Sequence, residues 1–408
     1  MNDYTSNIWK FYVASILSGF AVFYNGVDTL YYRHFDLSFE QIGVLVSASL
    51  TAILLFEIPT GSFADIYGKK TSILIGSFLT FVGLGFLAFG SDFASFAVGF
   101  ILLGIGRAFR SGAENALLYD WLSSVDKQQD YIRHQSRLQA AFVAIDIISG
   151  SAGFLLFGLN VRIPFIISFV SMALVILVQF TLKDSTPRAS HREHAMAVHV
   201  NQIKEGLLIV SRSRIIMWLI GFTLIYSIAN MFFSNALNLP FLREVKGFTT
   251  DQLALMGLLW NVIQTTCLFF VSQLERRLGQ FISILAIVIL TPLLFLGLLL
   301  SNNFLVSSII IGLYYSSMSF REVIIDTYLN TRISSQYRAT VLSIASMIIS
   351  GLAIFILPVL GIIVHRSSLD AGLFVLVVGT LILGALSMLV KRIMRDAGSA
   401  SQSKYGVH

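Results

Sequence analysis

The chain has 408 residues, of which 56% are hydrophobic and only 12% are charged. The charged fraction is about half that of an ordinary soluble domain, so the composition excludes a water-soluble globular protein and predicts a polytopic membrane protein. The formal net charge of +6 does not indicate nucleic-acid binding, because the basic residues are scattered between apolar runs. The single cysteine, Cys267, excludes a disulfide framework.

Apolar runs of spanning length recur along the whole chain. Each approaches the roughly 20 residues that an α-helix needs to cross about 30 Å of hydrocarbon. We therefore predict an all-α integral membrane protein with twelve transmembrane helices. The predicted spans lie near residues 8–32, 40–60, 71–90, 93–121, 135–159, 162–183, 214–241, 251–273, 281–300, 303–330, 336–364 and 370–391.

A polar segment divides these spans six and six. Its second part carries Val200, Ile203, Leu207 and Leu208 at helical spacing, which predicts an amphipathic helix on the membrane surface. Basic residues gather in the loops on the side of Lys69, so both termini are expected in the cytoplasm. The predicted parts are an N-terminal six-helix bundle at 1–183, a cytoplasmic linker at 184–213, a C-terminal six-helix bundle at 214–391 and a cytoplasmic tail at 392–408.

A short polar hairpin joins the second and third spans. It contains Gly61-x-x-x-Asp65-x-x-Gly68-Lys69-Lys70, in which the glycines permit a tight turn. The two lysines must stay in water or among lipid headgroups, because a charge at the bilayer centre costs about 2.5–3.5 kcal/mol on insertion scales.

The two halves of the chain repeat each other. Ser38-x-Glu40-Gln41 before the second span recurs 211 positions later as Thr249-x-Asp251-Gln252, and both patterns predict a capping box. Further matches follow in the same order, which indicates duplication of a six-helix unit. These matches are Gly68 with Gly279, Ser72-Ile73-Leu74 with Ser283-Ile284-Leu285, Phe109-Arg110 with Phe320-Arg321, Arg137 with Arg338, and Ile147–Gly150 with Ile348–Gly351.

The hairpin resembles the signature loop of the major facilitator superfamily, G-x-x-x-D-x-x-G-R/K-K/R. The resemblance implies two six-helix bundles around a central cavity, with a substrate site near the membrane midplane. It also implies that Asp65 braces the second helix against the eleventh and that Lys69 meets Asp120 at the end of the fourth. Ordinary loop salt bridges are the alternative for these contacts. The conformational-switch residues implied are Gly61, Asp65, Gly68, Lys69 and Asp120.

Ionisable side chains inside the spans are functional candidates, because charge in a membrane is costly. Arg107, Arg110 and Glu114 are spaced to share one face of the fourth helix. We expect these arginines to bind an anionic group or to favour ionisation of a proton-carrying acid, with a structural Arg110–Glu114 pair as the alternative. The other candidates for substrate binding or proton coupling are Asp28, Asp146, Arg321 and Glu322. The structural alternatives are that Asp146 neutralises Arg107 and that Arg321 and Glu322 form ion pairs between the two halves.

The function expected from this resemblance is secondary active transport of a small organic solute, with no enzymatic activity. Proton-coupled efflux of drug-like compounds or of a secreted metabolite such as a siderophore, by an antiporter, is the first hypothesis. Uptake by proton symport stays open, because the region from Asp146 to Phe154 lacks the proline of antiporter branches. A membrane receptor or enzyme is a further alternative.

The expected partners are the solute, protons and the lipid bilayer, with no cofactor, no nucleic acid and a monomeric state. Three linker histidines, His191, His194 and His199, match no compact zinc pattern, so no metal is expected. The branch that the hairpin resembles predicts a location in the bacterial cytoplasmic (inner) membrane.

Overall fold

The computed structural model describes residues 3–183, 204, 207–330, 333 and 338–404. Within these residues the chain is helical and contains no β-strand. Ten described helices are long and apolar enough to cross a membrane, which confirms the predicted all-α integral membrane class. The count of twelve spans stays a prediction. The chain divides into two compact units, the first comprising Met1–Asn201, Thr249–Gly257 and Ser350–Ile362, and the second comprising Gln202–Phe248, Leu258–Ile349 and Ile363–His408.

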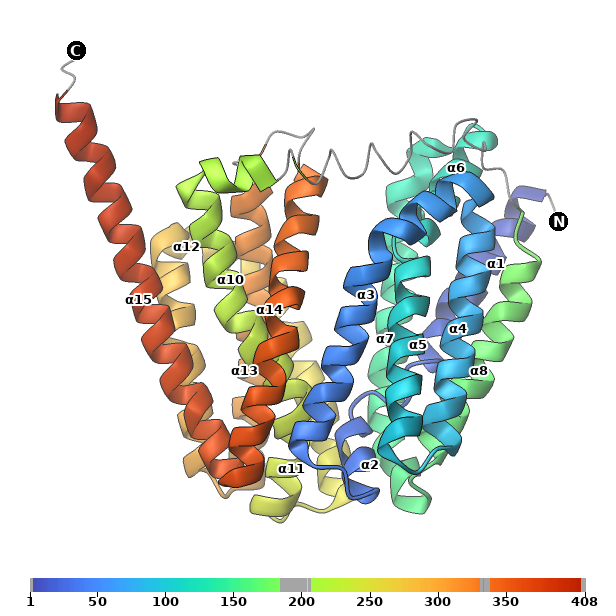
Figure 1. The fold of residues 1–408 in the computed structure, drawn as a ribbon, viewed down its shortest axis with the longest axis horizontal. Coiled ribbons are helices and arrows are strands. Elements are labelled where there is room, and N and C mark those ends of the chain that lie inside the picture. Colours follow the sequence, from blue (N-terminus) through green and yellow to red (C-terminus); the bar gives the residue numbers. More distant parts are fainter. Residues whose placement is uncertain (1–2, 184–203, 205–206, 331–332, 334–337, 405–408) are drawn as a thin grey trace. The chain divides into compact units, whose positions relative to one another are not determined.

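The first unit is built mainly from the N-terminal half. Within it, α5 packs against both α3 and α4, α8 packs against α4, and α1 packs against α7 and α8 (Figure 1). Its elements are α1 (Asp3–Phe20), α2 (Asp28–His34), α3 (Phe39–Tyr67), α4 (Lys69–Phe89), α5 (Phe93–Arg110), α6 (Ala113–Ser124), the 3₁₀ turn η1 (Gln128–Asp130), α7 (Tyr131–Leu159) and α8 (Ile163–Phe180).

Glycines let α4 and α5 approach each other closely. A Cβ added at Gly76 would lie 2.6 Å from the carbonyl oxygen of Gly106, and one at Gly83 would lie 3.0 Å from that of Gly99. Small residues are enriched at contacts between membrane helices because they let backbones come together. These glycine contacts therefore hold α5, which ends in Arg107 and Arg110, closely against α4.

Two predicted spans are interrupted. The first, predicted at 8–32, consists of α1 and α2 separated by a turn at 21–27, where Gly26 has φ +89°. The fourth, predicted at 93–121, consists of α5 and α6, and Gly112 between them has φ +73°. Glycine adopts positive φ without the steric cost that other residues meet, so each break coincides with a glycine.

The C-terminal half supplies the remaining elements. Among them, α10 packs against α13 and α15. Residues 250–300 form α12, which is kinked at Gly279, where the backbone is not helical. The predicted eighth and ninth spans lie on either side of this kink. The elements are α10 (Arg214–Phe232), the π-helix η2 (Phe233–Leu237), α11 (Asn238–Pro240), the π-helix η3 (Phe241–Val245), α12 (Thr250–Leu300), α13 (Phe304–Asn330), α14 (Arg338–Arg366) and α15 (Leu369–Lys404).

The predicted capping boxes are confirmed in both halves. The Ser38 hydroxyl accepts from the Gln41 backbone N–H at 3.1 Å, and Oε1 of Gln41 accepts from the Ser38 backbone N–H at 2.8 Å. The Thr249 hydroxyl and Oε1 of Gln252 accept in the same reciprocal way, at 3.3 and 2.9 Å. The backbone repeats as well, since Gly68 and its mate Gly279 both have positive φ, at +97° and +68°. Positions buried in both copies include Ile42 and Leu253, Ile73 and Ile284, Leu84 and Phe295, and Leu87 and Leu298.

Two predicted segments have different outcomes. Most of the predicted linker at 184–213, including Val200 and Ile203, lies outside the described residues, while residues 207–212 are helical. The predicted tail is helical as far as Lys404, because α15 continues past the end of the predicted last span. The predicted domain boundaries stay predictions.

Candidate functional site

The signature hairpin is anchored to α6. Gly68 ends α3 and starts α4 with φ +97° and ψ +143°. Immediately after it, the ammonium group of Lys69 forms an ion pair with the carboxylate of Asp120, and both side chains are about one-fifth exposed, at 18% and 20%. The contact that the resemblance implied is therefore present. Asp65 lies in the last turn of α3, and Gly61 lies one turn earlier.

The second lysine of the hairpin has a role that the sequence analysis missed. The Nζ of Lys70 donates hydrogen bonds to the carbonyl oxygens of Phe180 and Leu182, at 2.8 and 2.7 Å. Lys10 on α1 donates to the Thr181 carbonyl between them, at 2.8 Å. These carbonyls lie at the end of α8, where partial negative charge accumulates and cations are stabilising. The hairpin and the end of α8 are far apart in the sequence, so this contact could not be predicted from local patterns.

Arg110 and Glu114 form an ion pair across the break between α5 and α6. The Nε of Arg110 lies 2.8 Å from Oε1 of Glu114, with the side chains 23% and 44% exposed. The prediction that Arg107, Arg110 and Glu114 share one continuous helix face is wrong, because α5 ends at Arg110 and α6 begins at Ala113. The pair joins the two helix ends instead.

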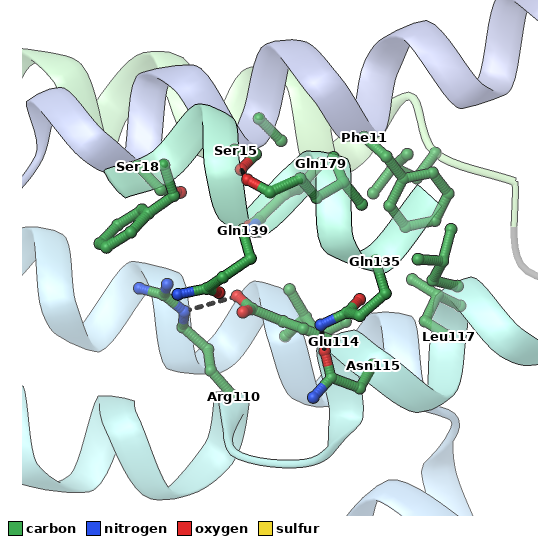
Figure 2. Close-up of a pocket in the computed structure, with 16 residues that line it drawn as sticks. Phe11, Ser15, Ser18, Arg110, Glu114, Asn115, Leu117, Gln135, Gln139 and Gln179 are labelled. Carbon is green, nitrogen blue, oxygen red and sulfur yellow. Dashed lines mark hydrogen bonds and ion pairs between the residues drawn. The ribbon is translucent and has the colours of Figure 1, made fainter. Parts of the chain in front are cut away.

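A pocket of about 310 Å³ opens beside this ion pair. Its walls come from α1, α4, α5, α6, α7 and α8, all within the first unit. Figure 2 shows the Arg110–Glu114 ion pair among the lining side chains. The polar lining residues are Ser15, Ser18, Arg110, Glu114, Asn115, Gln135, Gln139 and Gln179.

Arg107 has an electrostatic partner that the sequence analysis did not choose. Its side chain is exposed, and it interacts electrostatically with the partly buried Glu57 on α3. Asp146, the partner considered from sequence, lies in α7, and its side chain is outside the described part of the structure. Glu57 stands in an apolar run four residues before Gly61, which is the signal that could have identified it.

Asp28 is the first residue of α2, directly after the interruption of the first span. Its Oδ1 accepts a hydrogen bond from the backbone N–H of Thr29, at 2.9 Å. The interrupted segment packs on α7, where a Cβ at Gly153 would lie 2.9 Å from the carbonyl oxygen of Phe23. The Asp28 carboxylate therefore lies at the point where the first predicted span is interrupted.

Arg321 is deeply buried in the second unit, with 2% of its side chain exposed. Its Nη1 donates to Oγ of Ser227 at 3.2 Å and to the carbonyl oxygen of Thr223 at 3.4 Å, both on α10. Its Nη2 lies 3.4 Å from Oε1 of Glu322, whose side chain is 64% exposed. A buried guanidinium thus links α13 to α10, with an accessible carboxylate next to it.

A second group of polar side chains joins α13 to α10 and α11. The Tyr314 hydroxyl donates to Oδ1 of Asn230 at 3.1 Å. The Tyr315 hydroxyl accepts from Nδ2 of Asn238 at 3.2 Å. Asn238 follows the π-helix η2, and it is only 3% exposed. Its Oδ1 has no hydrogen-bond partner among the described residues. The sequence analysis could not foresee the two tyrosines.

The ion pairs and polar side chains described above are suited to binding a solute and to switching between conformations. In the described residues no three His, Cys, Asp or Glu side chains are grouped to hold a metal ion. Asp28, the Arg110–Glu114 pair and Asn238 lie next to helix interruptions, at 21–27, at Gly112 and at the π-helix η2, respectively. In membrane proteins, irregular backbone is tolerated where it is buried in protein or lines a water-filled cavity.

A family model described as Major Facilitator Superfamily matches residues 11–358. Two curated relatives are an uncharacterized MFS-type transporter, YxaM of Bacillus subtilis (strain 168), and the uncharacterized transporter BU466 of Buchnera aphidicola subsp. Acyrthosiphon pisum (strain APS). The first is 26% identical over 280 residues, which cover 65% of this chain and 67% of the relative. The second is 24% identical over 302 residues, covering 72% and 73%.

Solved transporters share the fold. A crystal structure of the nucleoside transporter NupG has a TM-score of 0.76 at 13% identity, covering 96% of this chain and 99% of that one. A D-xylose-proton symporter has a TM-score of 0.67 at 15% identity, covering 93% and 96%. A bacterial homologue of the lysosomal transporter Spinster has a TM-score of 0.71 at 13% identity, covering 96% and 98%.

Proposed function

The chain belongs to the Major Facilitator Superfamily, and we propose that this transporter exports a small organic solute in exchange for protons by alternating access. The observation that carries the coupled mechanism is the buried Arg321 beside the accessible Glu322. Protonation of an acid next to a fixed cation changes the local charge by one unit. Such a change shifts the balance between two conformations when their affinities for the proton differ.

The hairpin supplies the switching element of this proposal. Lys69 and Asp120 hold the α3–α4 turn against α6 in the conformation described here. We assign Gly61, Asp65, Gly68, Lys69 and Asp120 to the switch. Their contacts would break when the mouth at the Lys69 end opens. Arg107, Arg110, Glu114, Asp146, Arg321 and Glu322 are the proposed substrate and coupling residues.

Asp28 is the proposed proton carrier of the first unit, because it lies at the interruption of a spanning helix. Asp28→Asn keeps the shape of the side chain and removes its ionisation. We expect this substitution to abolish proton-driven flux while leaving the protein folded. Purified protein in liposomes with an imposed pH gradient and an internal pH dye measures the flux, and undiminished flux would remove Asp28 as a coupling site.

Uptake by proton symport is the second candidate function. It is favoured by α7, in which Gly150 and Gly153 face the interrupted segment without a nearby proline. Two arginines at the end of α5 would suit an anionic nutrient. A compound panel in a sensitised bacterial strain separates the directions. Resistance with lowered accumulation supports export, and rescue of growth on one nutrient supports uptake.

The proposed setting is the cytoplasmic membrane of a bacterium, with a monomeric protein whose two termini lie in the cytoplasm. The excess of basic residues on the Lys69 side supports this orientation. Terminal fusions to a reporter that is active only in the cytoplasm would test it, since loss of reporter signal at either terminus contradicts the topology.

A further inference from the structure

The pocket in the first unit contains hydrogen-bonding groups that the protein itself leaves unused. Gln179, on α8, is 4% exposed, and its Oε1 has no partner within the described part of the chain. A buried acceptor without a partner costs about 1–3 kcal/mol, so such atoms are rare in native proteins. A water molecule or a ligand that donates to this acceptor in the lining of the pocket would satisfy it.

Arg110 offers the complementary groups. Only its Nε is used, in the bond to Glu114. Its two terminal nitrogens bond to no residue that the structure describes. The Gln139 amide and the Ser18 hydroxyl, which also line the pocket, have no described hydrogen-bond partner either. Figure 2 places these side chains in the lining together with Gln179. The pocket therefore presents donors at Arg110 and a buried acceptor at Gln179.

The size and the walls of the pocket select the kind of occupant. A volume of about 310 Å³ lies at the lower end of small-molecule sites, which are mostly apolar with a few placed polar groups. Arg110 and Glu114 neutralise each other, so the pocket has no excess charge to attract an ion. The apolar walls are formed by Phe11, Ala14, Ile73, Leu117, Leu118, Leu138, Phe142 and Leu182.

We propose that this pocket binds a small uncharged molecule with an apolar body, an O–H or N–H donor at one end and a carbonyl acceptor at the other. The donor bonds to Oε1 of Gln179, and the carbonyl accepts from the free nitrogens of Arg110. This site lies inside one unit and shares Arg110 and Glu114 with the residues proposed above for substrate binding and coupling. It goes beyond the proposed function, because binding needs neither a gradient nor the second unit.

The position of the site gives the ligand a regulatory role. Arg110 and Glu114 bridge the break at Gly112, and α6 after this break carries Asp120, the partner of Lys69. A ligand that engages Arg110 acts on the same helix that holds the signature hairpin. Occupancy therefore stabilises the conformation in which α6 and the hairpin are joined.

Binding of 4-hydroxybenzamide to the full-length protein in lipid nanodiscs tests the site. This probe carries a phenolic donor and a carboxamide acceptor on an uncharged ring, and benzamide is its matched control without the donor. Titration calorimetry, with empty nanodiscs subtracted, measures both. We expect saturable binding at one site per chain, with benzamide at least about tenfold weaker, the loss typical of one hydrogen bond.

Variants locate the binding. Gln179→Met keeps the length of the side chain and removes the acceptor, so affinity should fall about tenfold. Gln128→Met, at an exposed glutamine in η1, is the matched control and should leave affinity unchanged. Ala14→Leu fills the pocket from α1 and should abolish binding, which provides a second variant if Gln179→Met does not fold. Thermal unfolding without the probe verifies that each variant is folded.

Three results would overturn the proposal. The first is no saturable binding of 4-hydroxybenzamide, which would leave the pocket with water only. The second is equal affinity for 4-hydroxybenzamide and benzamide. The third is unchanged affinity in folded Gln179→Met and Ala14→Leu proteins, since the probe would then bind elsewhere.

Discussion

The two partners of the buried Arg321 lead to a prediction in which a neutral hydroxyl contributes more stability than a charged carboxylate. Two single substitutions each remove one partner of its guanidinium. Ser227→Ala removes a neutral hydroxyl on α10 that lies 3.2 Å from Nη1. Glu322→Gln removes a formal negative charge that lies 3.4 Å from Nη2. We expect the neutral substitution to destabilise the protein more.

The magnitudes follow from exposure. Glu322 is 64% exposed, and exposed ion pairs contribute about 0–1 kcal/mol, so Glu322→Gln should cost at most about 0.5 kcal/mol. Ser227 is bonded to a group that is only 2% exposed. Hydrogen bonds to charged groups contribute about 1.5–3 kcal/mol in soluble proteins, and interhelical bonds in membranes reach about 1.7. We therefore expect a loss of about 1.5 kcal/mol for Ser227→Ala, about a tenfold change in the unfolding equilibrium.

Reversible unfolding in mixed detergent and SDS micelles, followed by circular dichroism, measures both differences. Ser211→Ala is the control, because the Ser211 hydroxyl is exposed and, among the described residues, bonds only to the Leu208 carbonyl within its own turn. It should change stability by less than about 0.5 kcal/mol, as surface substitutions usually do. If Glu322→Gln costs as much as Ser227→Ala or more, the assignment of the buried cation to α10 is refuted.

Three further substitutions test the hairpin and the scaffold. Asp65→Asn should lower transport and leave substrate affinity intact; selective loss of affinity in a binding assay would contradict a switching role. Lys70→Met should lower thermal stability by about 1 kcal/mol, because two carbonyls at the end of α8 lose a cationic donor, and unchanged stability would exclude this capping. Gly76→Ala should destabilise the protein because its Cβ would lie 2.6 Å from a carbonyl oxygen of α5, whereas Gly221→Ala, with nothing within 4 Å, should not; equal melting temperatures would contradict the close helix contact.

The hairpin and the repeat were predictable because their signals are local. The capping boxes depend on residues three apart, and the turns at Gly68 and Gly279 depend on glycine itself. The resemblance to the major facilitator superfamily is confirmed by the family match over residues 11–358. The prediction of a transporter rather than an enzyme is confirmed by the same match.

The partners of the charged residues were harder to predict, because they come from distant elements. Lys70 bonds to the end of α8, more than 100 positions away. Hydropathy marks a span but not its interruptions, so the break after Arg110 was missed even though Gly112 is visible in the sequence. Glu57 was not considered as a partner of Arg107, because sequence spacing does not report which helices are neighbours. The alternative that Asp146 neutralises Arg107 stays a prediction.

The repeat mates Arg110 and Arg321 show how duplicated helices come to do different work. The residue two positions after Arg110 is Gly112, which adopts φ +73° and ends the helix. The equivalent residue after Arg321 is Val323, a β-branched residue for which positive φ is strongly unfavourable, and α13 continues through it. Arg110 is therefore left at a helix end, where its side chain is 23% exposed and lines a pocket. Arg321 stays within a continuous helix and is buried against α10. The difference between glycine and valine at this repeat position thus leaves Arg110 at a helix end beside a pocket and keeps Arg321 in a continuous helix that it joins to α10.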